Sequence, residues 1–128
     1  MIKFTILYRK PEDLSAFEQF YITNLALMER IPGVLRREVS IVYGAPGGES
    51  TYHRALELYF EDKEALTAGL TSEAGQAAGH HLMQHAAQLA DLFFSEVFEE
   101  AGGFTPDALP VDTARDEADS SAEADEAS

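Results

Sequence analysis

Two polar residues, Tyr21 and Asn24, stand on the apolar side of an amphipathic helix that the sequence predicts over residues 11–33. Apolar residues recur there at spacings of three and four, the period of a helix with one buried face. A phenol can donate a proton, and an amide can orient a carbonyl or hydroxyl group. An amide on an apolar face is costly unless it is hydrogen-bonded. Asn24 therefore either lines a ligand pocket or bonds to nearby backbone.

Histidines are the next candidates for chemistry. His81 and His85 are four residues apart, so on a helix they share a face and could hold a metal together. The residues between them do not form the metalloprotease pattern HExxH, and the sequence offers no obvious third ligand. A haem ligand at His80, His81 or His85 would lack a basic cluster for the propionates. We therefore expect no bound metal and no cofactor.

Three further side chains could reach a cavity. His53 falls on a predicted strand in the same alternation set as Glu57, where it is either a base or a partly exposed sheet histidine. Tyr8 and Tyr59 could each direct a phenol inward, or they are amphipathic core residues. Helical spacing places two apolar side chains, Phe17 and Met28, beside Tyr21 and Asn24. The predicted ligand-binding residues are Tyr8, Phe17, Met28, His53 and Tyr59.

The elements that must position these residues follow from hydrophobic periodicity. Alternation of apolar and polar residues predicts strands at residues 2–8, 34–43, 51–60 and 91–100. Asp13 is the expected N-cap of the first helix, and Pro32-Gly33 ends it. A second helical region, from about residue 63, restarts at a new N-cap at Thr71-Ser72. Its glycines Gly69, Gly75 and Gly79 each weaken the helix by about 1 kcal/mol relative to alanine.

Composition limits the classes of partner. The chain has 128 residues, which suggests one domain, and no cysteine, which excludes disulfides and thiolate metal sites. Its net charge of −14 disfavours nucleic acid and anionic lipid. No apolar run is long enough for a membrane helix, and no secretion signal is evident, so we expect a cytoplasmic protein. Residues 1–100 form the predicted domain, and residues 101–128 form an acidic tail that we expect to be disordered.

The order of the predicted elements is strand, helix, strand, strand, helix, strand. Right-handed crossovers in each half give an α+β, ferredoxin-like βαββαβ sheet with both helices on one face. Apolar residues occur on both sides of these strands, so the second face also needs burial. One chain of this length has no third layer to cover it. We therefore predict a homodimer in which two sheets face each other.

The chain resembles the EthD family of dimeric α+β barrel proteins. The matching segments, within residues 1–100, are IKFTILYRKPED, FEQFYITNLALMERIPG, VSIVYGAPGGES, ALELYFEDKEAL and TSEAGQAAG. This resemblance implies a dimeric barrel with a small apolar cavity between helices and sheet in each subunit, and an association with ether degradation. The family helix usually carries His-Tyr and then His-Leu-Pro. Here those positions read Phe20-Tyr21 and Asn24-Leu25-Ala26, so both histidines are replaced.

Two functional hypotheses follow. The first is a cofactor-free, EthD-type oxidoreductase that acts on or binds a small apolar or aromatic molecule, with Tyr21 as proton donor or anchor and Asn24 as an orienting amide. The second is a non-catalytic barrel that binds a small ligand and has lost the family histidines. An amide cannot replace an imidazole in proton transfer near neutral pH, which favours the second hypothesis. The family label favours the first.

Overall fold

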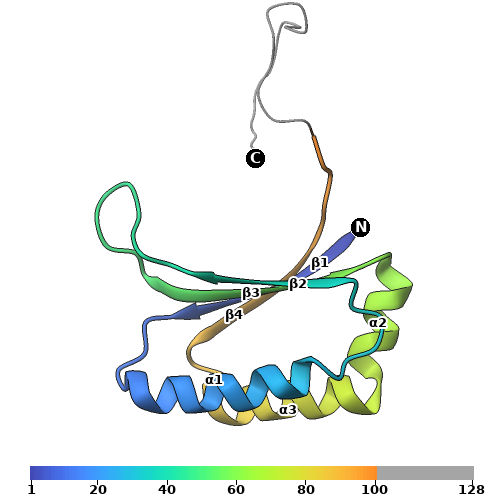
Figure 1. Cartoon of the computed structure of the whole chain (residues 1–128), viewed down its shortest axis with the longest axis horizontal. Helices are drawn as coiled ribbons and strands as arrows, with labels where there is room; N and C mark the ends of the chain where they lie inside the picture. Colours follow the sequence, from blue (N-terminus) through green and yellow to red (C-terminus); the bar gives the residue numbers. More distant parts are fainter. Residues whose placement is uncertain (101–128) are drawn as a thin grey trace, which may run out of the picture. The chain divides into compact units, whose positions relative to one another are not determined.

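The computed structural model describes residues 1–100, and the predicted tail at residues 101–128 lies outside that range. Figure 1 shows the strands and helices of the described chain. Their order is β1 (Ile2–Arg9), α1 (Leu14–Met28), β2 (Arg36–Ile41), β3 (Tyr52–Phe60), α2 (Lys63–Thr71), α3 (Glu73–Ala86) and β4 (Ala90–Glu96). The second and fourth strands are shorter than the predicted ranges 34–43 and 91–100. None of the helices among these elements is long and apolar enough to cross a bilayer.

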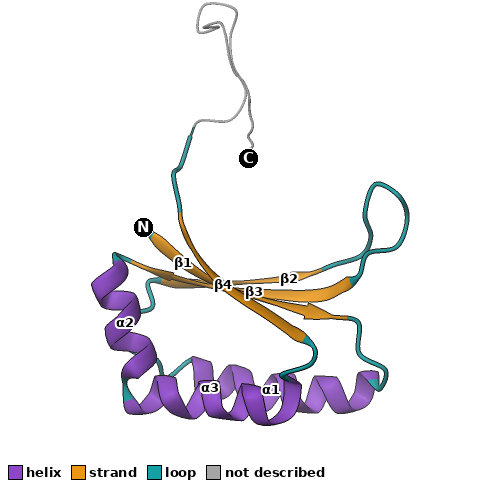
Figure 2. Ribbon diagram, turned by 180° about the vertical axis from the view of Figure 1, so that it is seen from behind, coloured by secondary structure: helices purple, strands orange, loops and turns teal. Residues whose placement is uncertain are grey.

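The four strands form one antiparallel sheet in the order β2-β3-β1-β4. Phe4 in β1 lies opposite Leu58 in β3 and Phe94 in β4, so these three side chains share a face. The helices all cover that face, with α1 and α3 running alongside each other and α2 at a steep angle to them (Figures 1 and 2). The α+β, ferredoxin-like architecture predicted from the element order is confirmed.

Capping side chains set where the helices begin. Asp13 Oδ1 accepts a hydrogen bond from the backbone N–H of Ala16 at 3.0 Å, which confirms the predicted N-cap of α1. Ser72 Oγ accepts from the backbone N–H of Gly75 at 3.0 Å. The second helical region is therefore divided at Ser72 into α2 and α3, as the Thr71-Ser72 pattern predicted.

Two of the three glycines in this region are required by close backbone packing. A Cβ atom on Gly69 would lie 2.7 Å from the carbonyl oxygen of Pro32, and one on Gly75 would collide with the carbonyl oxygen of Gly69. These positions let α2 turn sharply into α3 against the chain that follows α1. Gly79 differs, because a Cβ atom there would meet no atom within 4 Å. Only Gly79 thus carries the helix-weakening cost of glycine without a packing reason.

The core lies between the helices and one face of the sheet. It is built on the even-numbered side chains of β1, namely Ile2, Phe4, Ile6 and Tyr8, which are all buried. The opposite face carries charged pairs among its apolar residues: Lys3 Nζ lies 2.9 Å from Glu57 Oε2. Phe93 on that face is 47% exposed. This face is therefore the uncovered side of the sheet within residues 1–100, as the alternation predicted.

Candidate functional site

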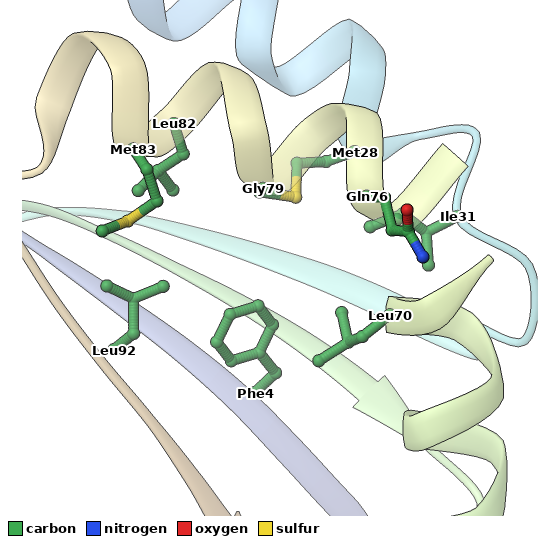
Figure 3. A pocket seen from close by; sticks show the side chains of 10 residues that line it. Phe4, Met28, Ile31, Leu70, Gln76, Gly79, Leu82, Met83 and Leu92 are labelled. Carbon is green, nitrogen blue, oxygen red and sulfur yellow. The ribbon is translucent and has the colours of Figure 1, made fainter. Parts of the chain in front are cut away.

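A cavity of about 220 Å³ lies between α3, the C-terminal end of α1 and the sheet (Figure 3). Phe4 and Leu92 form its floor on the sheet, and Leu82 and Met83 of α3 lie across from them. Met83 and Leu92 are exposed, which places them on the open side of the cavity, while Phe4 and Leu82 are buried. The ten lining residues are Phe4, Met28, Ile31, Leu70, Gly75, Gln76, Gly79, Leu82, Met83 and Leu92.

The lining limits what this cavity can do chemically. Apart from Gln76, its residues are apolar or glycine, and none of the ten has a titratable side chain. Gln76 Nε2 donates a hydrogen bond to the carbonyl oxygen of Thr71 at 3.0 Å, so one N–H group of its amide is engaged by the protein. The cavity can enclose an apolar molecule, and it contains no group that could transfer a proton to one.

A second cluster lies on the same face of the sheet, under the N-terminal half of α1. Arg54 of β3 donates to both carboxylate oxygens of Glu18, from Nη1 at 2.9 Å and from Nη2 at 2.6 Å. Its guanidinium carbon lies 4.5 Å from the ring centre of Tyr21 and 5.4 Å from that of Phe17. Arg54 is only 8% exposed. A buried arginine of this kind is tolerable because a bidentate carboxylate and two aromatic faces replace its water.

A β-bulge brings His53 into this cluster. Tyr8 pairs with Arg54, yet Arg9 pairs with Tyr52, so His53 has no partner in the β1–β3 register. Its ring lies 5.3 Å from that of Phe17, and its Nε2 atom is 3.7 Å from Glu18 Oε2. The predicted alternation placed His53 in the same set as Glu57, whose side chain the structure directs to the uncovered face. The extra residue of the bulge turns His53 to the other face, so the consecutive side chains of His53 and Arg54 both lie on the helix-facing side.

Tyr8 and Tyr21 complete the cluster, with ring centres 5.9 Å apart. Both hydroxyl groups are buried and contact no hydrogen-bond partner among the described residues. Burial raises the pKa of the Tyr8 hydroxyl, and the neighbouring Tyr21 adds to the effect. Burial likewise raises the pKa of Tyr21, opposed by the positive charge of Arg54. The hydrogen bond from Arg54 lowers the pKa of Glu18. At neutral pH the cluster therefore holds protonated phenols beside a closed ion pair.

Asn24 lies outside both regions, between α1 and α3. Its Nδ2 atom donates to the carbonyl oxygen of Ala78 at 3.1 Å and lies 3.0 Å from Nδ1 of His81. The side chain is 1% exposed and is not in the cavity lining. Of the two interpretations of Asn24, bonding to nearby backbone is the one its geometry fits.

The predicted site residues are thus divided among four places, one of which is the contact of Asn24 between α1 and α3. Tyr8, Phe17, Tyr21 and His53 come together in the Arg54 cluster. Met28 lines the apolar cavity instead. Tyr59, predicted with this group, lies on the opposite face of the sheet, where it donates to Glu38 Oε1 at 2.9 Å. Strand alternation accounts for this, because Tyr59 is an odd number of residues from the inward-facing Leu56, Leu58 and Phe60.

The sequence did not identify Arg54 and Glu18 as site residues. A signal for Arg54 was present, since a charged residue interrupts the apolar alternation of the third strand. A buried charge needs an opposite charge nearby, so this interruption indicates an acidic partner on a neighbouring element. Glu18 could not have been selected from the four acids at residues 12–29, because spacing along a helix does not specify which turn meets the sheet.

This ferredoxin-like α+β architecture is shared by solved structures. The chain is 34% identical to an ethyl tert-butyl ether d (EthD) family protein from Bacillus halodurans, with a TM-score of 0.74, covering 77% of this chain and 99% of that one. The chain belongs to the EthD family. A dimeric ferredoxin-like protein of unknown function from Jannaschia is 19% identical with a TM-score of 0.59, covering 76% and 100% of the two chains.

One protein related by sequence also covers most of this chain. An uncharacterized 11.0 kDa protein encoded in the thcB-thcC intergenic region of Rhodococcus erythropolis is 27% identical over 97 residues, covering 75% of this chain and 94% of that protein. No family model matches the chain. The resemblance stated from the sequence segments is therefore confirmed by a solved structure.

Proposed function

We propose that this protein binds a small apolar molecule in the cavity between α3, α1 and the sheet. The observation that supports this most directly is the lining, ten residues without a titratable group around about 220 Å³ of space. An apolar cavity of about 150 Å³ in another protein stays dry and accepts benzene. By proportion, this one would accept a ligand of roughly nine non-hydrogen atoms. Binding without proton transfer is the function such a lining performs best.

The family association with ethers supports the choice of ligand class. A small branched ether is mostly hydrocarbon, with one weak acceptor oxygen, so it loses little hydration on entering an apolar space. Hydrocarbons of the same size share the property. Ethyl tert-butyl ether, cyclohexane and benzene are therefore suitable probes, and a charged molecule such as benzoate is the negative control.

Filling the cavity tests the proposal. A Cβ atom at Gly79 would meet open space and the residue lines the cavity, so Gly79→Leu should fill it and abolish binding of all three probes. Ala77→Leu adds the same side chain to the exposed side of α3 and is the matched control. Binding is measured by calorimetry and by the ligand-induced rise in unfolding temperature. Equal probe affinity in wild type and Gly79→Leu would place the site elsewhere.

A second candidate function is a cofactor-free oxidoreductase with Tyr21 as the reacting or anchoring residue. What favours it is the Arg54 cluster, where a phenol with a raised pKa lies beside a guanidinium. Such a phenol stays protonated at neutral pH and can anchor a ligand by donating a hydrogen bond, and Asn24 would act only by holding α1 against α3. Turnover of an ether in the presence of oxygen, lost in Tyr21→Phe but retained in Gly79→Leu, would favour this function over simple binding.

We also propose a cytoplasmic homodimer assembled through the uncovered sheet face, with residues 1–100 as the binding domain and residues 101–128 as an acidic tail. The partly exposed Phe93 and the dimeric assembly of the Jannaschia neighbour support the dimer. Phe93→Glu would bury a charge in the contact between sheets, so it should give monomers in sedimentation experiments. Phe98→Glu, beyond the end of β4, is the control. Wild-type protein sedimenting as a monomer would refute this assembly.

A further inference from the structure

One polar contact joins the two helices that border the cavity. The amide nitrogen of Asn24 on α1 donates to the carbonyl oxygen of Ala78 on α3, and the same nitrogen lies 3.0 Å from Nδ1 of His81. The Ala78 carbonyl can only accept, so it fixes the amide with its nitrogen toward α3. Because the Asn24 nitrogen can only donate, Nδ1 of His81 must be the acceptor and must carry no proton.

Protonation of His81 is incompatible with this arrangement. A proton on Nδ1 would face the N–H groups of Asn24, so the hydrogen bond would be replaced by repulsion between two donor groups. The other groups near His81 are Phe20 of α1, stacked on it at 5.3 Å, and His85 of α3, whose ring centre is 4.6 Å away. The positively charged Lys10 and the negatively charged Glu12 line the same surface depression as His85. No carboxylate contacts His81 among the described residues.

The same helix carries the cavity on its other side. Gln76, Gly79, Leu82 and Met83 of α3 line the cavity, and Met28 of α1 lines it as well. His81 occupies the face of α3 that meets α1. The opposite face of α3, which lines the cavity, is the one drawn in Figure 3. Any separation of α1 from α3 must therefore change the wall of the cavity, since side chains of both helices contribute to it.

We propose that the cavity is regulated by pH through His81: when its imidazole takes up a proton, the contact with Asn24 breaks, α3 moves away from α1, and the ligand is released. This inference rests on the proposed binding function and adds its regulation. The direction is set by the geometry, because the closed arrangement accepts only the neutral ring. Binding is strong at neutral pH and weak in acid. Burial and the nearby His85 also lower the pKa of His81, in agreement with a neutral ring in the closed state.

Xenon is the most suitable probe, because it enters apolar cavities and has no titratable group of its own. Its affinity is measured by ¹²⁹Xe NMR titration between about pH 7.5 and about pH 5. We expect the affinity of the wild-type protein to fall several-fold across this range. His81→Gln keeps a side chain that can accept a hydrogen bond and cannot be protonated, so its xenon affinity should be independent of pH.

His80→Gln is the matched control, since it removes an adjacent, exposed imidazole and should retain the wild-type pH dependence. Imidazole ¹⁵N NMR of the unmodified protein reports the His81 tautomer directly, so the test does not depend on any variant folding. Pronounced pH dependence in His81→Gln, or a proton on Nδ1 at neutral pH, would overturn the inference.

Two failures can be separated. If xenon does not bind at neutral pH, the proposed binding function is wrong, and its regulation with it. If xenon binds equally at both ends of the range while His81 becomes protonated, the cavity is a binding site that His81 does not control.

Discussion

At one end of the helix-facing side of the sheet, side chains from α1, α3, β1 and β4 leave about 220 Å³ of apolar space. At the other end, the same helix and the same sheet are joined by a buried arginine, a carboxylate and a set of aromatic rings. The first region is held by hydrophobic contacts and can lose or gain a ligand. The second is held by charge-assisted hydrogen bonds, and each partner depends on the other.

This difference assigns separate tasks to the two regions. Removing an atom from the apolar region enlarges a space that already exists, whereas removing one partner from the Arg54 cluster leaves a charge buried. The Arg54 cluster fixes the position of the N-terminal half of α1 on β3. The cavity then forms where α1 ends and the backbone turns through Ile31 and Pro32 toward the sheet.

The largest effect is expected at the turn that closes the cavity. Gly75→Ala should lower the free energy of unfolding by about 3 kcal/mol, because its Cβ atom would push against the carbonyl oxygen of Gly69. Urea denaturation with circular dichroism provides the measurement. Wild-type stability in this variant would mean that α2 and α3 can separate easily, and the cavity wall would then be mobile.

In the Arg54 cluster, Glu18→Ala should cost about 2 kcal/mol, which is below the usual cost of breaking a buried ion pair because the Glu18 side chain is 38% exposed. Replacing both partners, as in Glu18→Ala with Arg54→Met, should recover part of that loss. The double-mutant cycle is followed by urea denaturation. Strict additivity of the two substitutions would show that the pair contributes no coupling.

Gly79→Ala should raise the stability by about 1 kcal/mol, since it removes the helix penalty of glycine at a position with open space. The matched comparison is Gly69→Ala, which meets the carbonyl oxygen of Pro32 and should be destabilising. Thermal unfolding of both variants tests the pair. A loss of stability in Gly79→Ala would mean that this part of α3 is more tightly packed than the cavity implies.

The smallest effect is the dependence of stability on pH. The pKa of His81 is lowered from 6.5 in the folded protein. Its contribution to the free energy of unfolding is therefore complete above pH 6.5 and declines as the pH falls toward the folded-state pKa. Glu18 acts in a lower window: its pKa is lowered from 4.5, so its contribution is lost as pH falls below that value through the folded pKa. Urea midpoints of wild type and His81→Gln from neutral pH to about pH 3 separate the two windows. A parallel decline in both proteins above pH 4.5 would exclude His81.

The sequence by itself determined the elements and their order. Alternation in β1 predicted that Ile2, Phe4, Ile6 and Tyr8 share one face, which the structure buries. Asp13 and Ser72 predicted where helices begin. These signals are local, because a side chain three residues away satisfies the free N–H groups of a helix. The topology followed from the order of elements and the handedness of crossovers, and the resemblance to the EthD family agreed with it.

Only the tertiary structure decided which polar groups meet. Asn24 and His81 are 57 residues apart, and Arg54 and Glu18 are 36 apart, so no local period relates them. The bulge at His53 depends on how β3 pairs with β1, and a register shift of one residue moves a side chain to the other face. The cavity depends on small residues such as Gly79 at the point where α3 crosses the sheet. Packing between distant elements sets these contacts, because the rotation of each helix about its own axis is fixed only when all elements are in place.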